Sequence, residues 1–106
     1  MVRLMQVSIG FILLMVTASS ALPVTNRDVL EMMSGKEAGV YLAATVDMAA
    51  FMAHVEGDRQ RSRCIVDWYF DNEDTTAYVM KVLERFQDRT PQAVIYTLIN
   101  RQCGEP

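Results

Sequence analysis

The stretch from Gly39 to Val55 is almost entirely apolar, contains no proline, and limits the folds open to this chain. Its main apolar row recurs at spacings of three and four, which place side chains on one face of an α-helix. The members of this row are Tyr41, Ala44, Met48, Phe51, Met52 and Val55. A second apolar row, Leu42, Val46, Ala49 and Ala53, lies beside it, so only a narrow polar strip is left, formed by Ala43, Asp47, Ala50 and His54. A helix this apolar needs several covering partners, so we predict the central helix of a small all-α domain with its main row packed inward.

The first 21 residues have the pattern of a secretory signal peptide. Arg3 gives a positive start, Leu4 to Val16 an apolar run, and Ser19-Ser20-Ala21 a small-residue cleavage site. The apolar run is shorter than the roughly 20 residues that span a bilayer. We therefore expect cleavage after Ala21, with an uncleaved signal anchor as the alternative. Residues 22–106 are predicted to form one helical domain in the periplasm or outside the cell.

The charge balance excludes some classes of partner. The chain has 10 Lys and Arg and 13 Asp and Glu, and only Arg3 lies in the predicted signal peptide, so the mature domain carries a net charge of −4. This charge gives no electrostatic reason to bind nucleic acid or anionic lipid. It suits a soluble domain, or one that meets a basic partner, without membrane contact after signal cleavage.

Both cysteines, Cys64 and Cys103, lie in the predicted mature chain. An export signal places them in an oxidising compartment, where an even number of cysteines indicates a disulfide. Closing a loop of about 40 residues stabilises a fold by roughly 4 kcal/mol on the chain-entropy model. We therefore predict a Cys64–Cys103 disulfide in a bundle of about four helices.

Three shorter helices are expected around the central one. The first starts after Thr25 or Asn26 and ends at Ser34-Gly35, where glycine supplies a helix stop. The third runs from about Thr75 to Gln87. The fourth is capped by Thr90, starts with Pro91, and ends at Gly104. Four residues of this last helix are expected to face inward: Val94, Ile95, Leu98 and Ile99.

The segment between the second and third predicted helices has a different character. Residues 57–63 form the most polar segment of the chain and are expected to be a solvated loop. Residues 64–70 (CIVDWYF) are rich in β-branched and aromatic types, which is typical of a strand. Because no second strand is predicted to pair with it, we expect an extended or single-turn segment held by the disulfide.

A partner-binding site is predicted beside this segment. Trp68, Tyr69 and Phe70 are consecutive, so they do not all point inward, and an exposed Trp or Tyr is a common anchor of protein interfaces. The acidic residues Asp71, Glu73 and Asp74 follow directly. The site is therefore assigned to Trp68, Tyr69 and these three carboxylates. Calcium is a less favoured interpretation of the carboxylates, because the residues lack the glycine and final glutamate of a calcium loop.

No catalytic motif is found in the sequence. The single histidine, His54, lies about two helical turns from Asp47, roughly 10 Å along the axis, which is too far for a direct hydrogen bond. Glycine-rich phosphate loops, HExxH motifs and nucleophile elbows are not present in the sequence. We therefore expect a protein that is not an enzyme and needs no cofactor or metal ion.

The order of elements resembles a known family. An exported chain with a short first helix continues into a helix carrying Tyr41-Leu42-x-x-x-Val46-Asp47, then Cys64, an amphipathic helix, a proline-started helix and Cys103. This pattern resembles the Tai-type immunity proteins of type VI secretion, although Ala44 stands where that family prefers glycine. The resemblance implies a small, disulfide-bonded periplasmic helical protein, often dimeric, that blocks a peptidoglycan-cleaving amidase.

Two alternatives remain open. The chain is also similar to the HdeA family of acid-stress periplasmic chaperones, which are small, helical and built around one disulfide. An envelope adaptor of another kind is the third interpretation. The expected partner is another envelope protein, with a peptidoglycan hydrolase toxin as the specific candidate and a homodimer as a further expectation.

Overall fold

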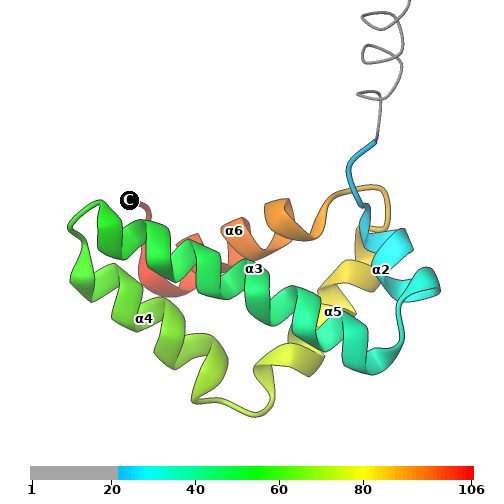
Figure 1. Cartoon of the computed structure of the whole chain (residues 1–106), viewed down its shortest axis with the longest axis horizontal. Coiled ribbons are helices and arrows are strands. Elements are labelled where there is room, and N and C mark those ends of the chain that lie inside the picture. Colours follow the sequence, from blue (N-terminus) through cyan, green and yellow to red (C-terminus); the bar gives the residue numbers. More distant parts are fainter. Residues whose placement is uncertain (1–21) are drawn as a thin grey trace, which may run out of the picture.

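The computed structural model describes residues 22–106, and the predicted signal peptide lies outside the described residues. The described part contains five α-helices and no β-strand (Figure 1). The helices are α2 (Asn26–Met32), α3 (Gly35–Val55), α4 (Arg59–Phe70), α5 (Thr75–Arg85) and α6 (Pro91–Cys103). This confirms the all-α class, with one helix more than the expected four.

Hydrogen-bonded capping boxes start the first two helices. Thr25 caps α2, where its hydroxyl accepts from the Asp28 backbone N–H and the Asp28 carboxylate accepts from the Thr25 backbone N–H. Ser34 and Glu37 form the same reciprocal pair at the start of α3. Gly35 is therefore the first residue of α3, and the expected glycine stop after α2 is wrong. Helix α3 starts four residues earlier than predicted.

Helix α4 is the largest departure from the sequence-based prediction. The expected loop and extended segment form one helix, which Asp58 caps by accepting from the Arg61 backbone N–H at 3.0 Å. Ile65 and Tyr69, four residues apart, are buried on the same side of this helix. Tertiary burial at helical spacing thus outweighs the strand preference of the β-branched and aromatic residues. Gly57 makes the turn from α3 possible because its φ is +90°, a conformation that favours glycine.

The last two helices form a hairpin. Thr90 caps α6 by accepting from the Ala93 backbone N–H at 3.2 Å, and Pro91 occupies the first turn, both as predicted. Gly104 follows α6 with a φ of +80°. At the start of α5, the Thr75 hydroxyl donates to the carbonyl of Trp68 at 2.8 Å, which fixes α5 against the end of α4.

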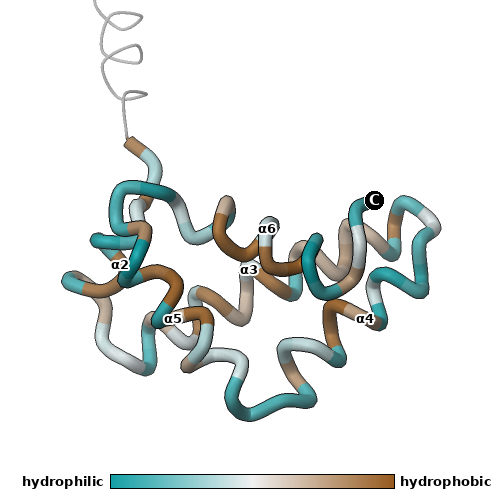
Figure 2. Tube along the Cα trace, turned by 180° about the vertical axis from the view of Figure 1, so that it is seen from behind, coloured by the Kyte–Doolittle hydropathy of each residue, from teal (hydrophilic) through white to brown (hydrophobic). Residues whose placement is uncertain are grey.

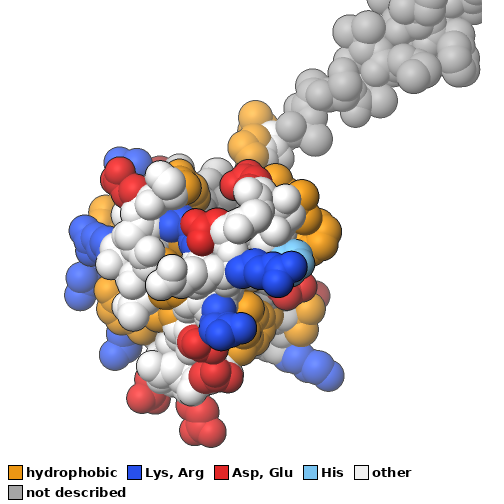
Figure 3. All heavy atoms as spheres, turned by 90° about the vertical axis from the view of Figure 1, so that its left-hand side faces the viewer, with side chains coloured by type: hydrophobic (Ala, Val, Ile, Leu, Met, Phe, Trp, Pro, Cys, Tyr) orange, Lys and Arg blue, Asp and Glu red, His pale blue; other side chains and the backbone are white. Residues whose placement is uncertain are grey.

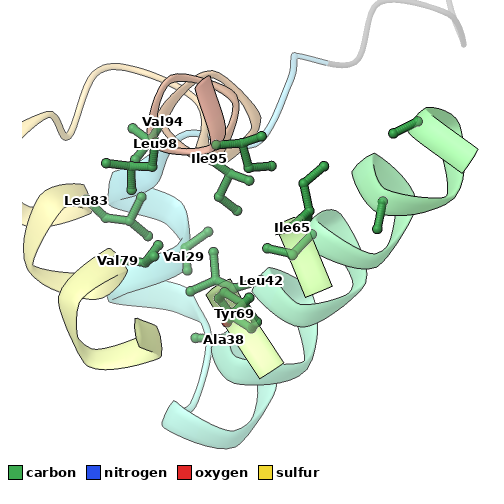
Figure 4. Close-up of a cluster of buried hydrophobic side chains, with 14 residues drawn as sticks. Val29, Ala38, Leu42, Ile65, Tyr69, Val79, Leu83, Val94, Ile95 and Leu98 are labelled. Carbon is green, nitrogen blue, oxygen red and sulfur yellow. The ribbon is translucent and has the colours of Figure 1, made fainter. Parts of the chain in front are cut away.

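All five helices contribute to one hydrophobic core. In Figure 1, α3 crosses the length of the domain and α4 runs back beside it. Figure 4 shows side chains from all five helices converging. The fully buried members include Val29, Leu42, Ile65, Leu83 and Ile95. All four residues of α6 that were expected to face inward are buried.

Helix α2 is held mainly through the loop between α5 and α6. The Asn26 side-chain amide donates to the Phe86 carbonyl at 2.7 Å, and the Asn26 backbone N–H donates to the Arg89 carbonyl at 2.8 Å. Asn26 is fully buried, and its side-chain oxygen has no hydrogen-bond partner among the described residues. The exposed pair Arg27–Asp88, at 2.9 Å, lies at the same junction. A helix of seven residues depends on such tertiary anchoring.

The predicted disulfide is present between Cys64 and Cys103. The Cα atoms are 5.9 Å apart and the cysteines are separated by 39 positions in the sequence. The bond joins α4 to the last residue of α6. Nearby, the Arg61 guanidinium donates to the Asn100 side-chain oxygen at 2.6 Å and to the Gly104 carbonyl. Polar and covalent contacts therefore hold the end of α6 against α4.

Removing this bond should lower stability without changing the helical class. We expect the double substitution Cys64→Ser/Cys103→Ser to lower the free energy of unfolding by about 2–4 kcal/mol, because the unfolded chain is no longer cross-linked. Urea unfolding followed by circular dichroism measures the difference. A reductant should destabilise the original protein and leave the double variant unchanged. Equal unfolding midpoints for the oxidised protein and the variant would contradict the prediction.

Candidate protein-interaction site

One face of α3 is apolar and open to solvent. We call it the α3 stripe, and it consists of Val40, Ala44, Met48, Phe51, Met52 and Val55, all of them exposed. Val40, Met48, Phe51 and Val55 each expose more than half of their surface. At roughly 200 Å² per large side chain, the five larger members leave about 600 Å² uncovered, the size of the largest patches on typical monomers. Patches of this size are often functional, so the α3 stripe is a candidate interaction site.

The α3 stripe corrects the expected orientation of the helix. Most of the row predicted to pack inward, including Met48 and Phe51, faces solvent, and Tyr41 is only half-buried. The buried residues of α3 lie on the opposite side: Ala38, Leu42, Val46, Ala50 and Ala53. Alanine at three of these positions allows neighbouring helices to approach closely. Spacing alone does not distinguish the two rows, but the alanines spaced along one side were a signal for the close-packed face.

Two surface grooves flank the centre of the α3 stripe, and Ala44 and Met48 line both of them. The first, of about 450 Å³, lies between α3 and α6 and includes Tyr41, whose hydroxyl accepts from the Gln92 side-chain amide at 2.7 Å. The second, of about 520 Å³, lies between α3 and α4 and includes Asp47 and His54. Ala44 is thus a low point in the stripe where a partner's side chain has room on either side.

Helix α3 is also long and apolar enough to cross a bilayer, by its length and composition. The core helix of a soluble domain can have the same length and composition, and α3 carries five of the buried residues of this core. Only 28% of its most apolar stretch of 18 residues is buried, because the α3 stripe faces outward. Figure 3, which views the end where α3 meets α4, shows hydrophobic side chains at the surface beside charged ones.

Of the two aromatic residues of the predicted site, the fold buries Tyr69 and leaves Trp68 half-buried. Tyr69 is only 5% exposed, so its assignment as an exposed anchor is wrong. Its ring makes edge-on contacts with Trp68 and Phe70, at centroid distances of 5.9 and 5.1 Å, and its hydroxyl accepts from the Thr76 hydroxyl. Phe70 is 47% exposed and is the most accessible of the three aromatics, although the sequence-based site did not include it. Because Tyr69 follows Ile65 by four residues, helical periodicity in this segment would have predicted its burial.

Trp68 and the carboxylates remain accessible. Trp68 is half-buried and lines an open groove with Asp74, Tyr78 and Gln102. Asp71 caps the end of α4, Asp74 precedes α5, and both are exposed, as is Glu73. Figure 2 shows this turn between α4 and α5 as a hydrophilic segment. The structure therefore brings Trp68 and Asp74 together in one groove and leaves Asp71 and Glu73 on the acidic turn beside it.

The described residues contain no group of three or more His, Cys, Asp or Glu side chains placed to hold a metal ion. Asp47 and His54 line the same groove beside the α3 stripe, with no hydrogen bond between them. Comparison of the chain with protein-family models, curated proteins and solved structures found no match.

The orientation of α3 predicts unequal effects for two substitutions. Leu42→Ala should lower the free energy of unfolding by about 2–5 kcal/mol, because it leaves a cavity in the core. Met48→Ala should change it by no more than about 0.5 kcal/mol, since the side chain is exposed. Urea unfolding of both variants measures these changes. A large loss of stability in Met48→Ala would show that the stripe is covered within the monomer.

Glu37 gives a prediction for pH. Hydrogen bonds from the backbone N–H and the hydroxyl of Ser34 hold the pKa of Glu37 below its ordinary value of 4.5. The ionised form therefore stabilises the fold above that pH, and this contribution is lost as the pH falls through the lowered pKa. Glu37→Gln keeps a capping side chain but removes the charge. The original protein should melt at a higher temperature than Glu37→Gln at about pH 7, with the difference closing near pH 3. A difference that widened towards acid would contradict this sign.

Proposed function

We propose that the protein is a small, non-enzymatic binding protein of the cell envelope, which inhibits a peptidoglycan-cleaving enzyme by docking through the α3 stripe. The observation that carries this proposal is the exposure of Val40, Met48, Phe51 and Val55 on one face of a helix fixed in the core. Burying these side chains against a partner removes apolar surface from water at little ordering cost, because α3 is already folded. A preformed helical face thus suits a protein partner.

The dimensions of the stripe support a protein interface. A standard interface buries about 800 Å² on each partner. The larger side chains of the α3 stripe offer about 600 Å² of that, and the two flanking grooves extend the surface towards Tyr96 on α6 and Val66 on α4. Large apolar side chains surrounding a small residue, Ala44, allow a side chain of the partner to insert between them. Hot spots of protein interfaces commonly occupy such pockets.

The choice of a peptidoglycan hydrolase as the partner comes from the resemblance to Tai-type immunity proteins. That resemblance includes the segment Tyr41 to Asp47, in which Leu42 and Val46 are core residues and Asp47 is exposed. Ala44, at the position where the family prefers glycine, lies in the stripe itself. A small residue is therefore placed where close approach of a partner is easiest.

A matched pair of methionine substitutions tests the proposal. Met48→Asp should abolish capture of a cell-wall hydrolase from an envelope extract at about pH 7, because it places a charge in the apolar contact. Met32→Asp should leave capture unchanged, because Met32 is also exposed, at 79%, but lies on α2 outside the stripe. Captured enzyme should release fewer soluble fragments from purified peptidoglycan when the original protein is added. Equal capture by both variants would refute the role of the stripe.

A second arm tests the site predicted from sequence. Trp68→Ala should weaken capture if the groove that contains Trp68 and Asp74 belongs to the same interface. This groove does not share a lining residue with the two grooves beside the α3 stripe. Loss of capture in Met48→Asp but not in Trp68→Ala would restrict the interface to α3.

An acid titration separates the inhibitor from the acid-stress chaperone. A chaperone of that kind exposes client-binding surface near pH 2–3, whereas the α3 stripe is exposed without acid. Among the described residues the only ion pair is Arg27–Asp88, so acid has few salt bridges to break. We expect the protein to remain folded near pH 3 and not to prevent aggregation of an acid-denatured client. Unfolding with suppression of aggregation would instead support the chaperone.

A further inference from the structure

A fourth groove, away from the α3 stripe, carries positive charge, whereas the domain as a whole is acidic. It lies between α5 and α6, has a volume of about 390 Å³, and we call it the α5–α6 groove. Its basic lining residues are Arg85, Arg89 and Arg101, and its aromatic ones are Tyr78 and Phe86. The remaining lining residues are Val82, Ala93, Val94, Thr97 and Leu98. It shares no residue with the grooves beside the α3 stripe.

No carboxylate lines the α5–α6 groove, although residues 22–106 carry a net charge of −4. Helix α6 has no Asp or Glu at all. Asp88, next to Arg89 in the sequence, is paired with Arg27 at 2.9 Å instead. Within residues 22–106, the guanidinium groups of Arg85, Arg89 and Arg101 form neither ion pairs nor hydrogen bonds with other side chains. Three charged donors therefore share one concave surface without a complementary charge.

Helix polarity accounts for only part of this arrangement. Arg85 and Arg101 lie in the last turns of α5 and α6, where a positive charge interacts favourably with the helix dipole. Arg89 lies in the loop between the helices and gains nothing from a helix end. Because all three arginines line the same groove, their shared position favours a role in ligand binding in addition to helix stabilisation.

The apolar part of the groove lies between its charges. Arg85, Phe86 and Arg89 are at the turn of the α5–α6 hairpin, whereas Tyr78 is in the first turn of α5 and Arg101 in the last turn of α6. Val94 and Leu98 are buried core residues whose remaining exposed atoms line the floor. Tyr78 and Phe86 are 51% and 47% exposed and form the sides. A ligand that fills the groove therefore needs an apolar centre and negative charge at both ends.

We propose that the α5–α6 groove binds an acidic peptide segment of a protein partner. The apolar side chains of the peptide pack against Val94 and Leu98, and its flanking carboxylates pair with the three arginines. Guanidinium groups pair with carboxylates in bidentate geometry, and arginine and tyrosine are enriched among interface hot spots. A fatty acid carries a single anionic head and would neutralise only one end. The volume falls at the lower end of ligand sites, about 300–1,000 Å³, which suits a few side chains of a peptide.

The test uses the purified, disulfide-bonded protein and two fluorescein-labelled probes. The first is the peptide Glu-Asp-Phe-Leu-Asp-Glu-amide with fluorescein attached to its N-terminal amine, and the second replaces its acids with Gln and Asn. Fluorescence anisotropy should show at least about tenfold tighter binding of the acidic peptide, with the advantage shrinking as salt is raised. Amide chemical-shift changes on adding the acidic peptide should concentrate at α5, α6 and the loop between them.

Matched charge reversals give the control. Arg85→Glu/Arg89→Glu should weaken binding of the acidic peptide about tenfold or more, whereas Arg59→Glu/Arg63→Glu should change it less than about twofold. The two doubles change net charge equally, and neither Arg59 nor Arg63 lines the α5–α6 groove. If the first double does not fold, as judged by circular dichroism, Arg85→Gln/Arg89→Gln replaces it.

Several results would overturn the proposal. Equal binding of the acidic and neutral peptides, or equal weakening by the two double variants, would leave no role for the α5–α6 groove. Shift changes produced there by dodecanoate but not by the acidic peptide would identify a fatty-acid site instead. Shift changes confined to α3 would assign the peptide to the α3 stripe. Because Met48→Asp should not affect binding of this peptide, failure here is distinguishable from failure of the proposed inhibitor function.

Discussion

The close approach of α3 and α4 is the contact on which the other features of the domain depend. Ala50 and Ala53 face α4, and the Ser62 hydroxyl on α4 donates to the Ala50 carbonyl at 2.8 Å. A short side chain reaches a carbonyl of the next helix only when the two backbones are close, and alanine leaves room for this. Fixing α4 in this way buries Ile65 and Tyr69 and positions Cys64 for its bond to Cys103.

This packing determines which side of α3 remains outside. The small side chains are used against neighbouring helices, so the bulky Met48, Phe51 and Val55 face solvent. Placing large apolar residues on an outer face has a cost in solubility, since such patches promote association. These large apolar residues are concentrated on one rigid helix between two grooves, as expected for a surface that binds a partner. The basic α5–α6 groove is separate from it, so the domain has two surfaces of different chemistry.

Sequence reasoning was most successful where a local interaction determines local structure. Thr90 with Pro91 at the start of α6, and Gly104 after its end, specify the helix ends through hydrogen bonding and φ preference, and they lie where they were predicted. Sequence reasoning failed where contacts with distant segments determine the local structure. Residues 64–70 favour a strand in isolation, but burial of Ile65 and Tyr69 against α3 makes them helical. Which of the two apolar rows of α3 is buried likewise depends on which helices cover it.

For the candidate site, the sequence located the accessible Trp68 and the acidic turn. It did not locate the α3 stripe or the α5–α6 groove, because finding these surfaces requires knowing which helices are neighbours.

The disulfide divides the described chain into two mechanically different parts. Residues 64–103 form a covalent ring that includes α5, α6 and most of α4, whereas α2 and α3 lie outside it. A pulling force transmitted through a protein docked on α3 would therefore act first on the non-covalent packing between α3 and the ring, because the disulfide does not cross-link α3. The force at which α3 detaches would depend on the packing of its alanines against the neighbouring helices. The ring would keep its contour length after α3 had detached.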